Sequence, residues 1–157
     1  NLIKDAGATL VIDTSGDCLA EAIKHKPYLI KPNEVELKEL LGYEFTDEKQ
    51  CIKELKKLND EGIGIVALSL GEKGSIISTK DKTLRIIPPD VMQVNDTGCG
   101  DVFLGGAVSM LYQGKDLVEA FRFATAIATS KVTKMGTSEF SLKETEEYMK
   151  EVTIYDV

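Results

Sequence analysis

Apolar and polar residues follow one another along the chain in two different rhythms. Short apolar runs bounded by turn residues are typical of buried strands, whereas apolar residues spaced three and four apart indicate helices. The run at 9–13 fits a buried parallel strand, and the run at 28–31 fits a second buried strand. The predicted strands are 9–13, 28–31, 63–70, 75–79, 83–87 and 152–155. The strands at 75–79 and 83–87 would form a hairpin across 80–82, and the last would lie at an edge of the sheet.

Capping residues, prolines and glycines mark where helices begin and end between these runs. The predicted helices begin at Ser15 or Asp17, at Pro32-Asn33, at Thr46 or Asp47, after Asp101, at about Asp116 and at the capping box Ser141-x-x-Glu144. Most of them end at a proline or glycine, namely Pro27, Gly42, Gly62 and Gly114. Asn1–Gly7 has the pattern of the last turn of a helix, so we expect the chain to be a fragment of a longer protein.

The alternation of strands and helices predicts an α/β fold with a mostly parallel sheet and an antiparallel portion. In such sheets ligands bind beyond the carboxyl ends of the strands. Three groups of polar residues are expected at that edge, namely Asp13, residues 31–36 and residues 69–74. Their shared position is stronger evidence for a ligand site than any one motif alone.

Composition limits the classes of function. With 157 residues, 43% hydrophobic and 29% charged, the chain fits one soluble globular domain, and no apolar run approaches the roughly 20 residues of a membrane span. The formal net charge of −7 argues against nucleic-acid or anionic-membrane partners, so a phosphate ligand would need local positive features. Three dispersed cysteines and a single histidine nearly exclude a zinc site or a histidine-based triad, and the free thiols fit the cytoplasm.

The most informative segment is Asn95-Asp96-Thr97-Gly98-Cys99-Gly100-Asp101, which runs directly into an apolar helix. A glycine turn that opens a helix aligns unpaired amides with the positive helix end, and this is a site for an anion. Asp101 is either a capping acid of an ordinary junction or a base that takes a proton while the amides hold a phosphoryl group. Gly105-Gly106 inside the helix costs about 1 kcal/mol per residue relative to alanine, so close packing is expected there.

Other features each have a structural and a functional interpretation. Asn33-Glu34-Val35-Glu36 is a capping box, or its first and last residues lie near hydrated Mg²⁺ and nucleotide phosphates. Ser69-Leu70-Gly71-Glu72-Lys73-Gly74 is a tight turn, or it lays amides against phosphates. Lys31 is a strand-end lysine that reaches solvent, or a cation that faces phosphate. Cys99 lies at a helix N-terminus, where thiol pKa values fall, but without a recognisable base beside it a small neutral spacer is favoured.

Four stretches together carry a resemblance to a known family. Val11–Gly16 resembles a DTSG strand end, Leu29–Leu37 a KPNxxEL segment, Ser69–Gly74 an SLGxxG turn and Asn95–Asp101 an NxxGxGD motif. In this order they resemble the ribokinase-like carbohydrate kinases, also called the phosphofructokinase B type, and most closely the 1-phosphofructokinase and tagatose-6-phosphate kinase branch. The chain departs from the ribokinase pattern at Asn95-Asp96, where Asp-Thr is usual, and at Cys99, where alanine or serine is commoner.

The resemblance implies a ribokinase-like three-layer α/β/α fold and a set of site residues. The implied residues are the catalytic base Asp101, the anion-hole residues Gly98, Cys99 and Gly100, the nucleotide-binding residues Lys31, Ser69, Gly71, Gly74, Ala126 and Ser130, and the metal-site residues Asn33 and Glu36. Residues 1–157 would form the C-terminal nucleotide-binding portion of a carbohydrate kinase. The family's N-terminal half, with most of the sugar-binding residues and the β-sheet lid, is expected to be absent from this chain.

The implied activity is phosphoryl transfer from ATP, with Mg²⁺, to a hydroxyl of a hexose phosphate of the fructose 1-phosphate or tagatose 6-phosphate type. The full-length protein would form a homodimer, and the isolated fragment is expected to have weak or no turnover. One alternative keeps the fold and changes the substrate to a simple sugar, a nucleoside or a pyrimidine alcohol. A second alternative is a non-catalytic nucleotide-binding module.

Overall fold

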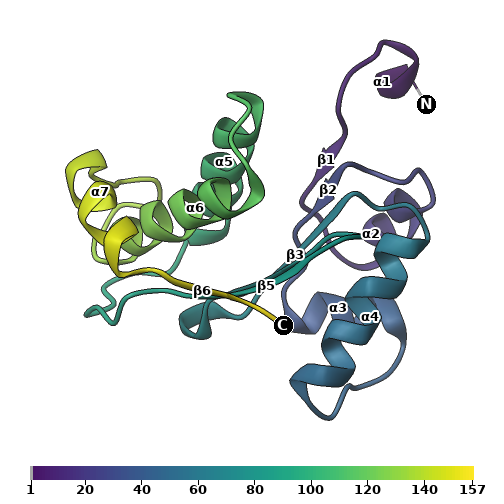
Figure 1. The fold of residues 1–157 in the computed structure, drawn as a ribbon, viewed down its shortest axis with the longest axis horizontal. Helices are drawn as coiled ribbons and strands as arrows, with labels where there is room; N and C mark the ends of the chain where they lie inside the picture. Colours follow the sequence, from purple (N-terminus) through teal and green to yellow (C-terminus); the bar gives the residue numbers. More distant parts are fainter. Residues whose placement is uncertain (1) are drawn as a thin grey trace. The chain divides into compact units, whose positions relative to one another are not determined.

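The computed structural model describes residues 2–157, and the chain divides into two compact units. The first unit comprises the chain up to Leu70, residues 75–83 and Val157. The second unit comprises residues 71–74 and 84–156. Each unit contains both strands and helices (Figure 1), as the α/β prediction requires.

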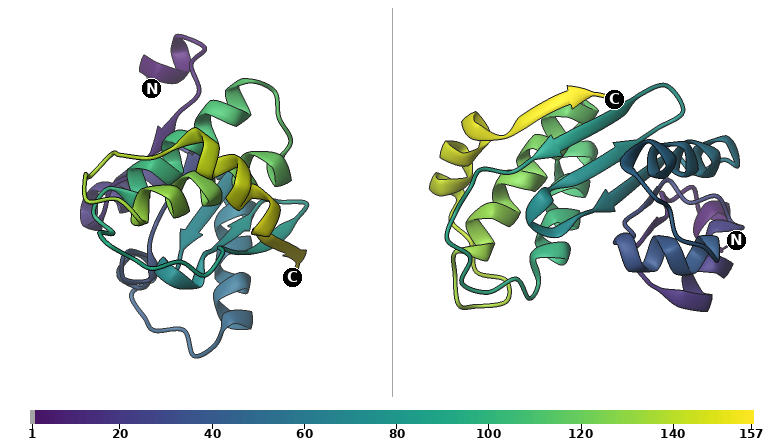
Figure 2. Two further views of the ribbon diagram at one scale, coloured as in Figure 1. Left: turned by 90° about the vertical axis from the view of Figure 1, so that its left-hand side faces the viewer. Right: turned by 90° about the horizontal axis from the view of Figure 1, so that it is seen from below.

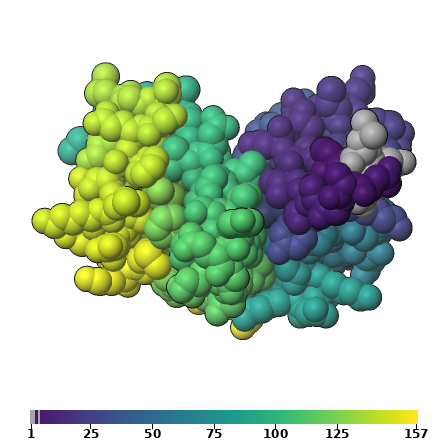
Figure 3. Space-filling model, turned by 90° about the horizontal axis from the view of Figure 1, so that it is seen from above, coloured from purple at the N-terminus to yellow at the C-terminus, as the bar shows by residue number. Residues whose placement is uncertain are grey.

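The first residues form a single helical turn, α1 (Leu2–Asp5). Gly7 follows with a φ of +72°, and the Ala8 amide donates to the Ile3 carbonyl at 3.0 Å, a usual way to close a helix end. The predicted helix end is therefore confirmed from Leu2 onward, while Asn1 lies outside the described residues. Residues 5–9 are exposed and lie on the surface of the first unit (Figure 3).

The strands of the first unit are both parallel and antiparallel. β1 (Val11–Ile12) pairs in parallel with β2 (Leu29–Ile30), β2 pairs in parallel with β3 (Ile65–Ser69), and β4 (Ser75–Ser78) runs antiparallel to β3. β2 and most of β3 are buried as predicted. The buried strand predicted at 9–13 is shorter in the structure, and β1 is only half-buried because it stands at the edge of the sheet.

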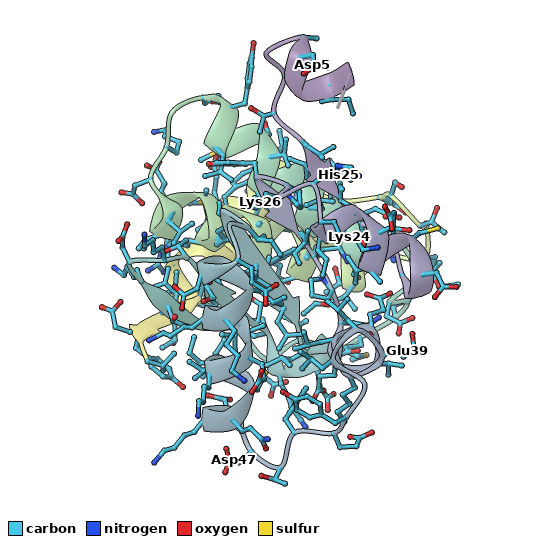
Figure 4. All side chains as sticks on the ribbon, turned by 90° about the vertical axis from the view of Figure 1, so that its right-hand side faces the viewer. Asp5, Lys24, His25, Lys26, Glu39 and Asp47 are labelled. Atoms are coloured by element: carbon cyan, nitrogen blue, oxygen red, sulfur yellow. The ribbon has the colours of Figure 1, made fainter. Side chains whose placement is uncertain are left out.

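Three helices cover the strands of the first unit: α2 (Gly16–Ile23), α3 (Glu34–Leu41) and α4 (Glu48–Asp60). Their inward side chains join those of the strands in one apolar cluster made of Leu19, Ile30, Leu37, Cys51, Leu55, Leu58, Ile63, Val66, Leu68 and Ile76. α3 ends at Gly42 in the left-handed conformation, as predicted. The chain's single histidine, His25, is exposed just beyond α2, between Lys24 and Lys26 (Figure 4).

The second unit packs three helices together beside an antiparallel pair of strands (Figure 2). These elements are β5 (Thr83–Ile87), α5 (Cys99–Tyr112), α6 (Leu117–Val132), α7 (Leu142–Glu151) and β6 (Thr153–Asp156). The predicted edge strand at 152–155 is confirmed by β6. Among the described residues, no helix is long and apolar enough to cross a membrane.

The close packing expected at the two glycines of α5 holds for only one of them. A Cβ on Gly106 would lie 2.9 Å from Cγ2 of Ile127 and 3.2 Å from Cα of Ala124, so α5 and α6 approach closely there. A Cβ on Gly105 would meet no atom of the described residues within 4 Å, and the expectation is wrong at that position.

Two predicted helix caps also differ from the structure. Ser15 is the residue before α2, but its side chain makes no capping hydrogen bond. At α7, Ser141 Oγ accepts from the Glu144 amide at 3.3 Å, but the Ser141 amide donates to Ser130 Oγ at 2.9 Å. The capping box is therefore only half formed, because the Glu144 carboxylate accepts from Ser130 and Lys134 instead.

Candidate functional site

The glycine turn of the second unit is anchored at its first residue, Asn95. The amides of Val94 and Asn95 both donate to the Val132 carbonyl, at 2.8 and 3.1 Å. The Asn95 side chain donates through Nδ2 to the Met135 carbonyl at 2.7 Å and accepts through Oδ1 from the Thr97 amide at 3.0 Å. These bonds fix the start of the turn against the end of α6, so the position of the turn is built into the fold.

Gly98 is the next fixed point of the turn. Its φ of +85° lies in the left-handed region, and a Cβ there would come within 2.1 Å of the Thr137 carbonyl oxygen. Both facts require glycine at this position. The close approach that this glycine permits is to the protein's own backbone at Thr137.

The amides at the start of α5 differ in their partners. The Cys99 amide, which the resemblance assigns to the anion hole, donates to the Asp96 carbonyl at 3.0 Å. The first hydrogen bond of the helix runs from the Val102 amide to the Gly98 carbonyl. The Gly98, Gly100 and Asp101 amides donate to no atom of the described residues, so they are the ones open to an anion.

Asp101 lies within the first turn of α5, because the helix begins at Cys99 rather than after Asp101 as predicted. Its side chain is exposed and makes no hydrogen bond or ion pair with any of the described residues. A capping acid would accept a backbone amide, as Asp47 does from Gln50 and Asp116 does from Glu119. Asp101 therefore differs from the capping acids of the same chain and leaves its carboxylate available to a substrate.

The Cys99 thiol points into the second unit. Its Sγ lies 4.0 Å from the Asn95 carbonyl oxygen and 3.9 Å from that of Ala128. Burial raises the pKa of this thiol, and Asp96 adds to the rise, while Lys131 opposes it. The lowering expected at a helix N-terminus is thus outweighed by desolvation, and the structure favours the interpretation of Cys99 as a small neutral spacer.

Lys131 is the residue near this turn that the sequence analysis did not single out. It lies near the end of α6, is completely buried, and donates from Nζ to the Asn95 carbonyl oxygen at 2.6 Å. α6 is apolar nearly all round, and a lysine close to its end has the pattern of a solvent-facing residue. The one usable signal was the need for a positive feature near a phosphate site in a chain of net charge −7.

Two residues expected near adenine, Ala126 and Ser130, are completely buried in the second unit. Ser130 Oγ donates to Glu144 at 2.7 Å and accepts from the Ser141 amide, so it ties α7 to α6. Lys134 donates to the other oxygen of Glu144 at 2.6 Å. Their assignment to adenine stays a prediction, and the hydroxyl of Ser130 already has a structural role.

In the first unit the structure brings Asn33 next to Ser69. Asn33, which lies beyond the end of β2, forms a parallel bridge with Ser69, the last residue of β3, and the Ser69 amide donates to the Pro32 carbonyl at 2.9 Å. Asn33 also caps α3 in a complete capping box: the Glu36 amide donates to Asn33 Oδ1, and the Asn33 amide donates to Glu36 Oε2, both at 2.9 Å. The structural interpretation of this motif is therefore confirmed.

The same residues fit a magnesium ion only in a limited way. The described residues contain no group of three or more His, Cys, Asp or Glu side chains that could hold a metal. Glu36 Oε2 is engaged in the capping box, and Oε1 accepts no hydrogen bond from the described residues. Because Mg²⁺ keeps several waters and takes one or two carboxylates together with substrate phosphates, one open oxygen is sufficient for a contact through water.

Lys31 is neither solvent-reaching nor unpaired. It is 8% exposed, and its Nζ lies 3.1 Å from Oδ2 of Asp13, so the pair joins the ends of β1 and β2. The turn at 71–74 is a single 3-10 turn, η1 (Gly71–Lys73), closed by the Gly74 amide donating to the Gly71 carbonyl at 3.0 Å. A Cβ on Gly74 would lie 2.1 Å from the Ile86 carbonyl oxygen, whereas Gly71 is open.

Comparison with known proteins identifies the family. The profile of the pfkB family carbohydrate kinases matches residues 1–145. The chain belongs to this family. It is 35% identical to a 1-phosphofructokinase of Borreliella burgdorferi over 132 residues, which cover 83% of the chain and 43% of that protein. It is 40% identical to a ribokinase of Haemophilus influenzae over 108 residues, which cover 69% of the chain and 35% of that protein.

The solved structures agree with this assignment. Phosphofructokinase-2 from Escherichia coli, in complex with substrates and products, matches 94% of the chain and 48% of its own length with a TM-score of 0.89 and 26% identity. The predicted ribokinase-like α/β/α fold is thereby confirmed. The chain spans about half the length of the relatives that it matches.

Proposed function

We propose that this chain is the nucleotide-binding and base-carrying portion of an ATP-dependent hexose-phosphate kinase of the fructose 1-phosphate or tagatose 6-phosphate type. The observation that carries the proposal is Asp101. This exposed carboxylate in the first turn of α5 has no partner among the described residues, and the amides beside it donate to none of them. A carboxylate beside an anion site suits a reaction that moves a proton and a phosphoryl group together.

In the proposed reaction, Asp101 accepts the proton of the acceptor hydroxyl. The hydroxyl oxygen forms a bond to the γ-phosphorus as the bond from that phosphorus to the β,γ-bridging oxygen breaks, and ADP leaves with the electron pair. The Gly98 and Gly100 amides and the dipole of α5 stabilise the charge on the phosphoryl group in transfer. The Asp101 amide belongs to the same set. Mg²⁺, when bound, would neutralise charge on the nucleotide phosphates. In the first unit, the open oxygen of Glu36 is the group that would contact such an ion through water.

The test is Asp101→Asn in the intact protein, with Mg-ATP and a panel of fructose 1-phosphate, tagatose 6-phosphate, ribose and nucleosides. We expect kcat to fall by orders of magnitude, about 10²–10⁴-fold for the loss of a general base, with little change in the dissociation constant of the nucleotide. Asp96→Asn is the matched control, because Asp96 lies in the same turn and its side chain is exposed. Its bond to the Cys99 amide is made by its backbone carbonyl and does not depend on the side chain. Near-normal turnover of Asp101→Asn would overturn the base assignment.

A second candidate keeps the fold and takes a simple sugar. The observation in its favour is the 40% identity to a protein named ribokinase. Against it stands Asn95, whose side-chain Nδ2 donates to the Met135 carbonyl, a bond that an aspartate at this position cannot make. The substrate panel separates the two candidates. A non-catalytic module would bind Mg-ATP in a calorimetric titration and turn over none of these substrates.

A further inference from the structure

Lys131 is a buried cation without a carboxylate partner among the described residues. It is 0% exposed, and the one hydrogen bond that its ammonium makes within residues 2–157 runs to the Asn95 backbone carbonyl at 2.6 Å. Two other lysines of the second unit do have carboxylate partners: Lys115 pairs with Glu119 and Lys134 with Glu144. Moving an ammonium group out of water is strongly unfavourable unless other interactions replace its hydration, so this placement calls for an explanation.

The surroundings of the ammonium point to the glycine turn. Asn95 is the first residue of the turn and is held by three further hydrogen bonds, through its backbone amide, Nδ2 and Oδ1, so a bond to its carbonyl acts on a rigid point. The charge is also felt at Cys99, whose thiol pKa it lowers against the effect of burial. Lys131 therefore acts on both ends of the segment that leads into α5, and it does so from inside the protein, where salt screens little.

We propose that Lys131 is a positioning residue of the phosphoryl-transfer site: its buried ammonium holds the Asn95 carbonyl and adds a fixed positive charge at the start of the turn. This inference rests on the proposed function. In a chain of net charge −7, a phosphate-binding turn needs a local positive charge, and a cation held in a low-dielectric interior supplies it without reorganisation during the reaction.

The first test removes the charge and keeps the volume. In the intact protein, Lys131→Met should lower kcat by about 100-fold, the lower part of the range for loss of an oxyanion-hole donor, with KM for the sugar phosphate nearly unchanged. Lys115→Met is the matched control, because it removes the same charge from an exposed pair just before α6. Its kcat should stay at the wild-type value. If kcat of Lys131→Met stays within about threefold of the wild-type value, the inference is overturned, because that change is much smaller than the loss of an oxyanion-hole donor causes.

The second test restores the charge. Lys131→Ala leaves room for a small cation, and added methylammonium should raise its kcat in a saturable way, while Lys131→Met should not respond. A lysine that serves packing alone would give variants with lower thermal stability and no recovery of kcat by methylammonium. That result contradicts the inference.

A third measurement needs no variant. In the wild-type protein labelled with ¹⁵N at the lysine Nζ, the signal of the buried ammonium should shift when MgADP and fluoroaluminate, a mimic of the phosphoryl group in transfer, are added. An unchanged signal overturns the inference, and this result can be obtained even if the variants do not fold. Absence of any turnover by the wild-type protein overturns the proposed function instead, and the same signal then decides whether Lys131 responds to an anion in the turn.

Discussion

In the first unit the polar residues at the strand ends hydrogen-bond to one another, whereas in the second unit the start of α5 leaves a carboxylate and several amides without partners within residues 2–157. Asn33 and Glu36 exchange two hydrogen bonds, and Lys31 pairs with Asp13. Asp101, in contrast, has no partner among the described residues, although the turn before it is held rigidly at Asn95.

This difference separates positions that support the fold from positions that are free to act on a ligand. The motif at Asn33 performs a structural task whether or not a nucleotide binds, so its presence alone is weak evidence for chemistry. The turn before α5 performs a structural task through Asn95 and Gly98 and leaves Asp101 outside it. A site for chemistry is therefore indicated by groups that the fold positions and does not itself use.

The largest effect is expected for Gly98→Ala, which tests how strictly the turn of the second unit is built. The new Cβ would meet the Thr137 carbonyl oxygen at 2.1 Å, in addition to the strain of a φ of +85°. We expect the free energy of unfolding to fall by about 3 kcal/mol in urea denaturation, together with loss of any phosphoryl transfer.

Gly42→Ala in the first unit is the matched control for that change. Gly42 has a φ of +75°, but a Cβ there would meet no atom of the described part of the chain within 4 Å, so only the backbone strain of about 1 kcal/mol applies. Equal losses in the two variants would show that the Thr137 contact is not rigid, and the contrast between the two regions would weaken.

A smaller effect is expected at the capping box of the first unit, where structure and chemistry can be separated. Asn33→Ala removes the acceptor for the Glu36 amide and should lower the free energy of unfolding by about 1 kcal/mol. Glu36→Gln keeps an oxygen for the Asn33 amide, so its thermal stability should change little.

The functional interpretation of Glu36 is tested by the same pair of variants. If the open Glu36 oxygen holds magnesium through water, Glu36→Gln should raise the Mg²⁺ concentration needed for half-maximal turnover while the protein stays folded. A Glu36→Gln protein with an unchanged Mg²⁺ requirement would assign this motif to the fold alone.

Local signals made most of the fold predictable. α3 and α4 have clear capping residues, apolar residues on one face and, for α3, a glycine that ends the helix, and these features depend on residues a few positions apart. β1 was harder, because two paired residues at the edge of a sheet are half-buried and an apolar run alone does not show where it lies in the sheet.

The site was predictable where chemistry follows the local sequence and not where it depends on distant contacts. The turn at Asn95 to Asp101 was visible as a motif. Lys131 was missed because its partner, the Asn95 carbonyl, is 36 residues away and carries no side-chain signature. Ser130 was assigned to a ligand, although its hydroxyl bonds to Glu144 on a later helix, for the same reason.

The smallest effect is expected for acid sensitivity, which compares one glutamate–lysine pair from each unit. The hydrogen bond from Lys57 holds the pKa of Glu54 below its usual value, and Lys134 and Ser130 do the same for Glu144. A lowered folded-state pKa contributes stability above the unfolded-state pKa, and this stability is lost as the pH falls through the lowered pKa. Both contributions should therefore fade as the pH falls below the ordinary value of 4.5.

Urea denaturation at a series of acidic pH values measures this fading, with Glu54→Gln and Glu144→Gln each removing one contribution. Glu54 sits in a helix with its partner three residues away, whereas Glu144 joins α7 to α6 through Ser130. Glu144→Gln should therefore also increase hydrogen exchange in α7, and Glu54→Gln should leave exchange in α4 nearly unchanged. Equal effects on the two helices would mean that the link between α6 and α7 depends on apolar packing rather than on this carboxylate.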